Sequence, residues 1–218
     1  AIVQIGDGLF VHGGLNPGLK IRSAAELDDK IHVEIANIDD LWQSLSEKKI
    51  IWRYMTLDEI IPFISEEMKL MQARGREEDA SAIQAMKKLM DYKTWLACSP
   101  DGPLWYRGLA YEKEEQLLNP VVSMLQTLNA RYIVSGHTVL SKSNVVARFE
   151  NRAFLIDAGM NRKAYNGRPA ALEIKNSGFT AHTRTGSQKF SPVRGTAGRG
   201  GRFRVFSPNC PQLKGVSS

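Results

Sequence analysis

Two short apolar runs separated by glycines open the chain. Residues 2–5 read Ile-Val-Gln-Ile, a Gly-Asp-Gly triplet follows, and residues 9–11 read Leu-Phe-Val before His12 and a Gly-Gly pair. Apolar runs of this length joined by a glycine-containing turn are typical of a β-hairpin. We therefore predict a hairpin over residues 2–12, in which His12 lies where the second strand stops.

The pattern then changes to helical spacing. Apolar residues recur at every third or fourth position after Ser23, a residue type suited to the N-cap of a helix. Thr56 and Glu59 form the signature of a capping box for a second helix, and a third periodic stretch covers about residues 77–96. Together these stretches predict a helical cap insertion at about residues 23–98.

A loop rich in proline and glycine then leads back to sheet-forming sequence. Residues 104–108 read Leu-Trp-Tyr-Arg-Gly, an aromatic loop that contains Arg107, and helical spacing follows over residues 112–128. The next apolar run begins at Tyr132 and ends in Gly136-His137. Further strands are predicted at residues 144–149, 153–156 and 171–174. Because helix and strand alternate here, we expect an α/β fold.

Charge divides the chain into a body and a tail. From residue 184 to the end there are seven lysines and arginines and no acidic residue, which leaves −1 of the total charge of +6 for the remainder. The stretch is also rich in glycine and serine and contains few aromatic residues. We predict a body over residues 1–182 and a disordered basic tail over residues 183–218, and the near-neutral body disfavours nucleic acid as its partner.

Three polar side chains beside glycine residues are candidates for chemistry, namely His12, Arg107 and His137. Each lies in or just after a loop at the end of an element, where α/β folds concentrate their ligand-binding groups. The two histidines could present neutral imidazoles to one metal ion, and Arg107 could offer its planar guanidinium to two phosphate oxygens. Considered singly, each is more often a structural residue or part of a surface ion pair.

A carboxylate follows the predicted strand at residues 153–156. Asp157 could orient a metal-bound histidine through a hydrogen bond, or it could cap the turn at Ala158-Gly159, and the sequence does not decide between these roles. His32, within a helical pattern, and His182, beside the tail, receive no role.

Four segments, taken in order, resemble a known family. Residues 9–17, Leu-Phe-Val-His-Gly-Gly-Leu-Asn-Pro, resemble the HGG segment of calcineurin-like metallophosphoesterases of the phosphoprotein-phosphatase type. Residues 101–108 resemble the aromatic-arginine loop of their bacterial-like members, sometimes called Shewanella-like phosphatases. Residues 135–139 and 155–160 resemble that family's GHT strand and the strand after it. The resemblance covers about residues 1–175 and corresponds to the C-terminal portion of such an enzyme.

The resemblance implies a partial four-layered α/β/β/α metallophosphoesterase fold and hydrolysis of phosphate monoesters with two divalent metal ions, Mn, Fe or Zn. By position, His12 and His137 would be ligands of the second metal and Arg107 would bind the phosphate. A bridging water with a lowered pKa would attack a phosphoprotein or a small phosphate ester. The helical insertion would form a cap and contribute to substrate selectivity.

Three motifs that complete the metal site in this family do not occur in the chain. They are GDxHG, GDxxDRG and GNHE, which supply the first metal's ligands, the bridging aspartate, an asparagine ligand and the acid histidine. The chain also begins at Ala1 within an apolar run, without an initiator methionine. We therefore expect a fragment or split protein that forms at most one partial metal site, and targeting to a compartment cannot be read from it.

Two other interpretations stay open. The chain could be a non-catalytic remnant or binding module whose basic tail contacts nucleic acid or an acidic partner. It could also fail to fold alone, with an exposed sheet edge that favours aggregation. Two distant cysteines indicate neither a disulfide framework nor a zinc ribbon, and no apolar stretch approaches the ~20 residues of a membrane-spanning helix.

Overall fold

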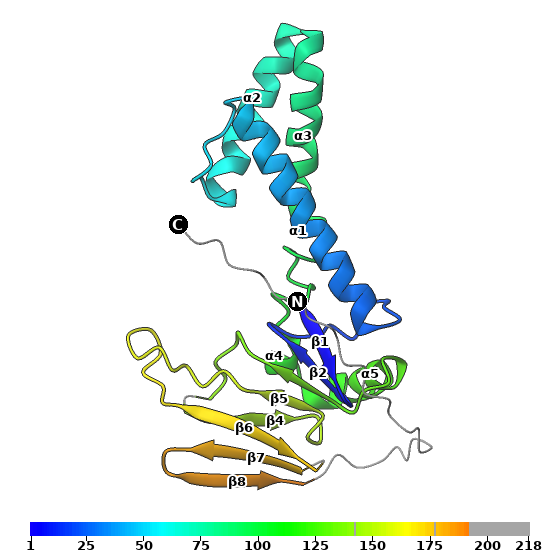
Figure 1. Ribbon diagram of the computed structural model, residues 1–218, viewed down its shortest axis with the longest axis vertical. Coiled ribbons are helices and arrows are strands. Elements are labelled where there is room, and N and C mark those ends of the chain that lie inside the picture. Colours follow the sequence, from blue (N-terminus) through cyan, green and yellow to red (C-terminus); the bar gives the residue numbers. More distant parts are fainter. Residues whose placement is uncertain (142, 177, 192–218) are drawn as a thin grey trace, which may run out of the picture.

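The computed structural model describes residues 1–141, 143–176 and 178–191. In this part of the chain, eight strands form two sheets, and a helical arm extends away from them (Figure 1). The helices are α1 (Ala24–Glu47), α2 (Leu57–Arg74), α3 (Ala80–Met90), α4 (Gly108–Tyr111) and α5 (Glu114–Thr127). The strands are β1 (Ile2–Ile5), β2 (Gly8–Val11), β3 (Tyr132–Ser135), β4 (Val146–Arg148), β5 (Ala153–Leu155), β6 (Ala170–Lys175), β7 (Gly178–Thr183) and β8 (Gly186–Phe190).

The first sheet has a parallel centre and antiparallel edges. Its order is β1-β2-β3-β5-β4, with β2, β3 and β5 parallel to one another. The tight turn between β1 and β2 requires a positive φ at Gly6, +60°, which glycine adopts without a steric penalty. Because parallel strands end at the same edge of a sheet, the residues that follow β2 and β3 are brought together.

One face of this sheet packs on helices and the other on the second sheet. Leu9 and Ile133 face α5, where they join a core that includes Val121 and Leu125. On the opposite face, Phe154 stacks on Phe179 of β7 with ring centroids 4.4 Å apart. The second sheet has the order β6-β7-β8. The fold is therefore α/β, as predicted, and the described residues form helix, sheet and sheet layers in succession.

The helical arm has a hydrophobic core of its own. Leu45, Ile60, Ile64, Met86 and Leu89 are fully buried between α1, α2 and α3. The predicted caps are present: the Ser23 hydroxyl accepts from the backbone N–H of Glu26, and Thr56 and Glu59 form a capping box. The third helix is shorter than predicted. Separate 3₁₀ turns at Glu77–Asp79 and Tyr92–Thr94 flank α3, and the chain becomes extended at Trp95.

The body extends beyond the boundary that we predicted at residue 183. β8 pairs with β7 from Gly186 to Phe190, so the predicted tail begins after this strand. The arginine-glycine centre of the tail lies outside the described residues. The predicted strand at 144–149 is also too long, because Phe149 has φ +53° and leaves the sheet.

The edge strand β1 exposes apolar side chains on one face of the sheet. Val3 and Ile5 are 52% and 61% exposed, on the same face as Phe10. Exposed apolar edges of this kind promote pairing with other chains. Among the described residues, no helix has the length and hydrophobicity that a membrane span requires.

Candidate functional site

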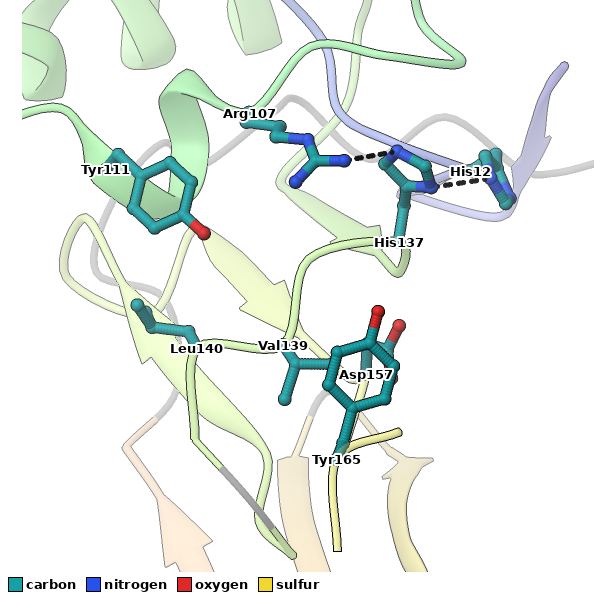
Figure 2. Close-up of a pocket in the computed structure, with 8 residues that line it drawn as sticks. All are labelled: His12, Arg107, Tyr111, His137, Val139, Leu140, Asp157 and Tyr165. Atoms are coloured by element: carbon teal, nitrogen blue, oxygen red, sulfur yellow. Dashed lines mark hydrogen bonds between the residues drawn. The ribbon is translucent and has the colours of Figure 1, made fainter. Parts of the chain in front are cut away.

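The parallel pairing of β2 and β3 brings two histidines together. The last paired residues are Val11 and Ser135, and His12 and His137 follow them directly or after one glycine. The backbone N–H of Gly136 donates to the carbonyl of His12 at 2.9 Å, which extends the ladder by one bond. His12 Nε2 then lies 3.1 Å from His137 Nδ1 (Figure 2). Two residues that are 125 positions apart thus share one site.

The backbone of His137 is strained. Its φ is +61°, and a hydrogen bond of 2.6 Å from the Thr138 N–H to the Gly136 carbonyl closes a three-residue turn around it. This positive-φ form of the γ-turn is the rare one, and a left-handed non-glycine residue costs about 1–3 kcal/mol. The turn aims the imidazole at His12. Strain that the fold maintains at a strand end is characteristic of ligand-binding positions.

Gly13 and Gly14 allow the aromatic loop to approach this strand end. Both donate their backbone N–H groups to the carbonyl of Pro103, at 2.8 and 3.2 Å. A Cβ atom on Gly13 would meet the Leu104 carbonyl oxygen at 2.6 Å, so a larger residue would push the loop away. The docked loop carries Arg107, whose Nη2 lies 3.1 Å from His137 Nε2. All three predicted site residues therefore converge.

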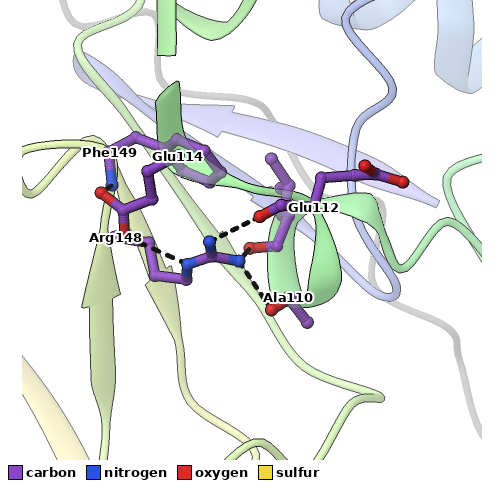
Figure 3. Close-up of polar contacts among 6 residues, drawn as sticks. Ala110, Glu112, Glu114, Arg148 and Phe149 are labelled. Atoms are coloured by element: carbon purple, nitrogen blue, oxygen red, sulfur yellow. Dashed lines mark hydrogen bonds and ion pairs between the residues drawn. The ribbon is translucent and has the colours of Figure 1, made fainter. Parts of the chain in front are cut away.

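Arg148, whose side chain is 13% exposed, fixes the element that follows Arg107. The Nη1 atom of Arg148, on β4, donates to the carbonyls of Leu109 and Ala110 at 2.8 and 2.6 Å. Its Nη2 donates to the Glu112 carbonyl at 2.6 Å, and its Nε pairs with the Glu114 carboxylate at 3.2 Å (Figure 3). These carbonyls are the orphan acceptors at the C-terminal end of α4.

The contacts of Arg148 affect the site because α4 connects two residues that line it. Arg107 is the N-cap of α4, and Tyr111 is its last residue. Both side chains line the same pocket. A guanidinium at the C-terminal end of a helix is also favoured by the helix dipole. Arg148 therefore holds the orientation of Arg107 without contacting the pocket itself.

The hydrogen bonds of His137 determine its tautomer. A guanidinium can only donate, so Nε2 of His137 accepts from Arg107 and carries no proton. The proton of neutral His137 is then on Nδ1, facing Nε2 of His12. Burial, followed by the charge of Arg107, lowers the pKa of His137. The neutral form, which can bind a metal, is thereby favoured.

The pocket in front of the histidines has a volume of about 480 Å³. His12, Arg107, His137 and Asp157 contribute polar groups, and Tyr111, Val139, Leu140 and Tyr165 complete its wall (Figure 2). Residues 24–98 do not contribute to this lining, so in the described part of the chain the helical arm does not cover this pocket.

Asp157 lies in the pocket but does not orient either histidine. Its Oδ1 accepts the backbone N–H of Gly159 at 3.0 Å, which is the turn-capping alternative. Within the described residues, no hydrogen bond joins Asp157 to His12 or His137. Its negative charge raises the pKa of His137 and partly offsets the larger opposing effects of burial and Arg107.

Two buried hydroxyls on the same strand end lack partners. Ser135 and Thr138 are 1% and 2% exposed, and neither hydroxyl has a hydrogen-bond partner among the described residues. A buried polar group without a partner costs about 1–3 kcal/mol. These hydroxyls and the strained backbone between them both lower stability. We infer that the residues at the end of β3 are constrained by function as well as by stability.

The separation of the two histidine nitrogens matches a hydrogen bond between them, and two nitrogens bound to one metal ion would have a similar separation. Two nitrogens bound at about 2.1 Å to one ion, at angles of about 90–110°, lie about 3.0–3.4 Å apart. The observed separation of 3.1 Å falls in this range. In the described part of the chain, no group of three or more His, Cys, Asp or Glu side chains is placed to hold a metal.

Sequence reasoning missed several contributors to the site. Tyr111 lies four residues after Arg107, a helical spacing that could have identified it, but α4 itself was not predicted. Tyr165, in an irregular segment, gave no comparable signal. Arg148 was read only as part of a strand, because its contacts with Leu109–Glu114 span 34 to 39 residues of sequence.

Comparisons with known proteins add little to this geometry. No protein-family model matches the chain. An uncharacterised protein of Schizosaccharomyces pombe, C1840.07c, is 40% identical over 77 residues, which are 35% of this chain and 23% of that protein. The chain thus aligns with less than a quarter of the length of this relative. A solved cold-active protein tyrosine phosphatase is 19% identical, with 87% of this chain and 41% of that chain covered and a TM-score of 0.43. A likeness of this extent defines neither a family nor an activity.

Proposed function

We propose that the protein hydrolyses phosphate monoesters with the help of divalent metal ions, Mn, Fe or Zn, and that this chain supplies part of the site. The observation that carries the proposal is the convergence of His12, His137 and Arg107, from three separate elements, on one pocket. Two imidazoles suit a metal, and a guanidinium suits the oxygens of a phosphate. The phosphorylated substrate is a protein or a small ester.

The residues of the chain have defined tasks in this proposal. His12 Nε2 and His137 Nδ1 would give their lone pairs to the metal, which supplies Lewis-acid activation of water and phosphate when bound. His137 would then carry its proton on Nε2, the atom that now accepts from Arg107. Because Nε2–H cannot accept a hydrogen bond, Arg107 would turn from His137 to the phosphate oxygens.

Electrostatics support an anionic ligand. Arg107 contributes a positive charge to the pocket, while Asp157 is its one carboxylate among the lining residues of the described chain. A metal ion at the histidines would make the pocket strongly positive. A phosphate would neutralise this charge, and once Arg107 has turned to it, the fixed position of the Arg107 backbone at the start of α4 would limit the reorganisation needed in the transition state.

The test combines metal binding with turnover. Mn²⁺ binding is measured by electron paramagnetic resonance, and phosphatase activity on an aryl phosphate is measured in parallel, for this chain and for the full-length gene product. We expect weak Mn²⁺ binding by the chain, tighter binding and turnover by the full-length protein, and loss of both in His12→Ala. Turnover by the full-length protein that persists in His12→Ala would contradict the proposal.

A further inference from the structure

Tyr111 extends into the candidate pocket, and the proposed function gives it no task. It is the last residue of α4 and lines the pocket together with Arg107, the N-cap of the same helix. Tyr111 is 63% exposed, although a tyrosine ring stabilises a protein most when it packs against other apolar groups. Packing in the hydrophobic core therefore does not explain why the ring of Tyr111 lies here.

The spacing of Arg107 and Tyr111 places both side chains on the same side of α4. Residues four positions apart lie on one face of a helix, with their Cβ atoms about 5–6 Å apart. The backbone N–H of Tyr111 donates to the carbonyl of Arg107 at 3.1 Å, so the helical turn that joins them is formed. Figure 2 shows the Tyr111 hydroxyl directed into the pocket, with Arg107 between it and His137. The phenol and the guanidinium thus reach the same cavity from one helical turn.

The Tyr111 hydroxyl is available to a ligand. Among the described residues it has no hydrogen-bond partner in the protein, and a phenol hydroxyl can donate one hydrogen bond. The planar fork of Arg107 suits two oxygens of a phosphate monoester, which has three oxygens outside the ester bond. An anion held by Arg107 in this pocket therefore has acceptor sites left for a second donor on the same helical turn.

We infer that the Tyr111 hydroxyl donates a hydrogen bond to a phosphate oxygen of the bound substrate, beside the guanidinium of Arg107. The inference rests on the proposed function and adds a phosphate-binding residue to it. Arg148 supports both groups, because its contacts with the carbonyls of Leu109 and Ala110 fix the turn that carries them. A donor and a guanidinium held on one rigid turn fix the orientation of the phosphate relative to the histidines.

Binding of inorganic phosphate to the full-length protein loaded with Zn²⁺ tests the inference. Tyr111→Phe removes the hydroxyl and keeps the ring. Calorimetry should give a dissociation constant about tenfold higher for this variant, because a hydrogen bond to a charged group is lost. Tyr54→Phe, the same change at an 81% exposed tyrosine between α1 and α2, should leave the dissociation constant within about twofold of the wild-type value.

A fluorine label reports on the contact without removal of the hydroxyl. 3-Fluorotyrosine is incorporated at position 111 alone, and its ¹⁹F resonance is followed by NMR in the protein loaded with diamagnetic Zn²⁺. Inorganic phosphate should shift this resonance, because the acceptor of the neighbouring hydroxyl changes from water to an anion. The same label at position 54 should not respond to phosphate. A purely structural role of Tyr111 would give no such response at position 111 either.

The outcomes separate the inference from the proposed function. Phosphate binding that is unchanged in Tyr111→Phe and weakened in Arg107→Ala would overturn the inference and leave the phosphatase proposal in place. A fluorine resonance at position 111 that does not respond to saturating phosphate would do the same, since the hydroxyl would then lie away from the anion. Binding that is unchanged in Arg107→Ala, or absent in the wild-type protein, would overturn the proposed function and the inference with it.

Discussion

Two clusters that contain histidine, one on the second sheet and one at the candidate site, differ in their partners and surroundings. His182, near the C-terminal end of β7, lies 2.9 Å from Ser187 of β8 through Nδ1 and 3.0 Å from Glu173 of β6 through Nε2. These are the groups of a serine hydrolase triad, yet the side chains of His182 and Glu173 are 46% and 51% exposed on the outward face of a regular sheet. Each nitrogen of His182 has an ordinary cross-strand partner. The arrangement is complete without a ligand.

The cluster at His12 and His137, by contrast, is not complete without a ligand. The partners of His137 are a second imidazole and a guanidinium, neither of which brings negative charge. The backbone of His137 is strained, whereas His182 lies in a regular strand. The comparison teaches that residue types do not identify a site. Unfavourable geometry, and a charge that the fold leaves uncompensated, are more informative.

The largest expected effect is a loss of activity that distinguishes the two clusters. In the full-length protein, His137→Ala should lower kcat/KM for an aryl phosphate by about 10³-fold or more, because a metal ligand is removed. His182→Ala, the matched control, should change it by less than about twofold, because only exposed hydrogen bonds are lost. Steady-state kinetics with excess Mn²⁺ measure both. Similar losses in the two variants would refute the distinction between the clusters.

Arg107 tests whether uncompensated positive charge has a function. Arg107→Ala should lower kcat/KM by about 10²–10³-fold, as for the loss of one oxyanion donor. Arg107→Lys keeps the charge and loses the planar fork, so it should recover only part of the activity. Kinetics of both variants, with Arg168→Ala at an exposed position as the control, measure the effect. Wild-type activity in Arg107→Ala would show that the charge serves structure alone.

The features that the sequence predicted correctly depend on residues that are close together in the chain. The first two helices were predicted with their N-caps because Ser23 and Thr56 act on residues within one turn. His12 and His137 were predicted at strand ends because apolar runs stop there, and parallel pairing then determines their proximity. The two residues are far apart in sequence, and only the resemblance to a phosphatase family led to the prediction of a common role.

Features that depend on distant packing were missed. β8 contains mainly polar and exposed residues, so no apolar alternation indicated a strand, and its pairing with β7 alone determines it. Likewise, Arg148 contacts carbonyls that become acceptors only once α4 has formed. The hydrophobic pattern of one segment does not show such contacts, because each contact depends on a partner that is distant in the sequence.

Substitution of Arg148 tests a residue that contacts α4 and does not line the pocket. Arg148→Met should lower the free energy of unfolding by about 2 kcal/mol, since three carbonyls and the Glu114 carboxylate lose a partly buried donor. It should also lower kcat/KM by about tenfold, mainly through KM, because Arg107 loses its fixed orientation. Denaturant unfolding and kinetics measure these effects. Arg148→Lys should restore part of the stability and less of the affinity, because an ammonium cannot reach all four acceptors; equal recovery of both would argue for a purely structural role.

The smallest effect concerns the titration of His137 in the metal-free chain. Burial and the charge of Arg107 lower its pKa, so His137 should titrate below the ordinary value of about 6.5. Because a depressed pKa favours the neutral folded form, its contribution to stability is complete above the unfolded pKa and is lost as the pH falls through the folded pKa. Arg107→Ala should move the midpoint upward, while burial keeps it below the ordinary value. Imidazole resonances followed by NMR from pH 8 to pH 4 give the midpoint in both proteins, and a midpoint unchanged by Arg107→Ala would show that the guanidinium does not act on His137 in solution.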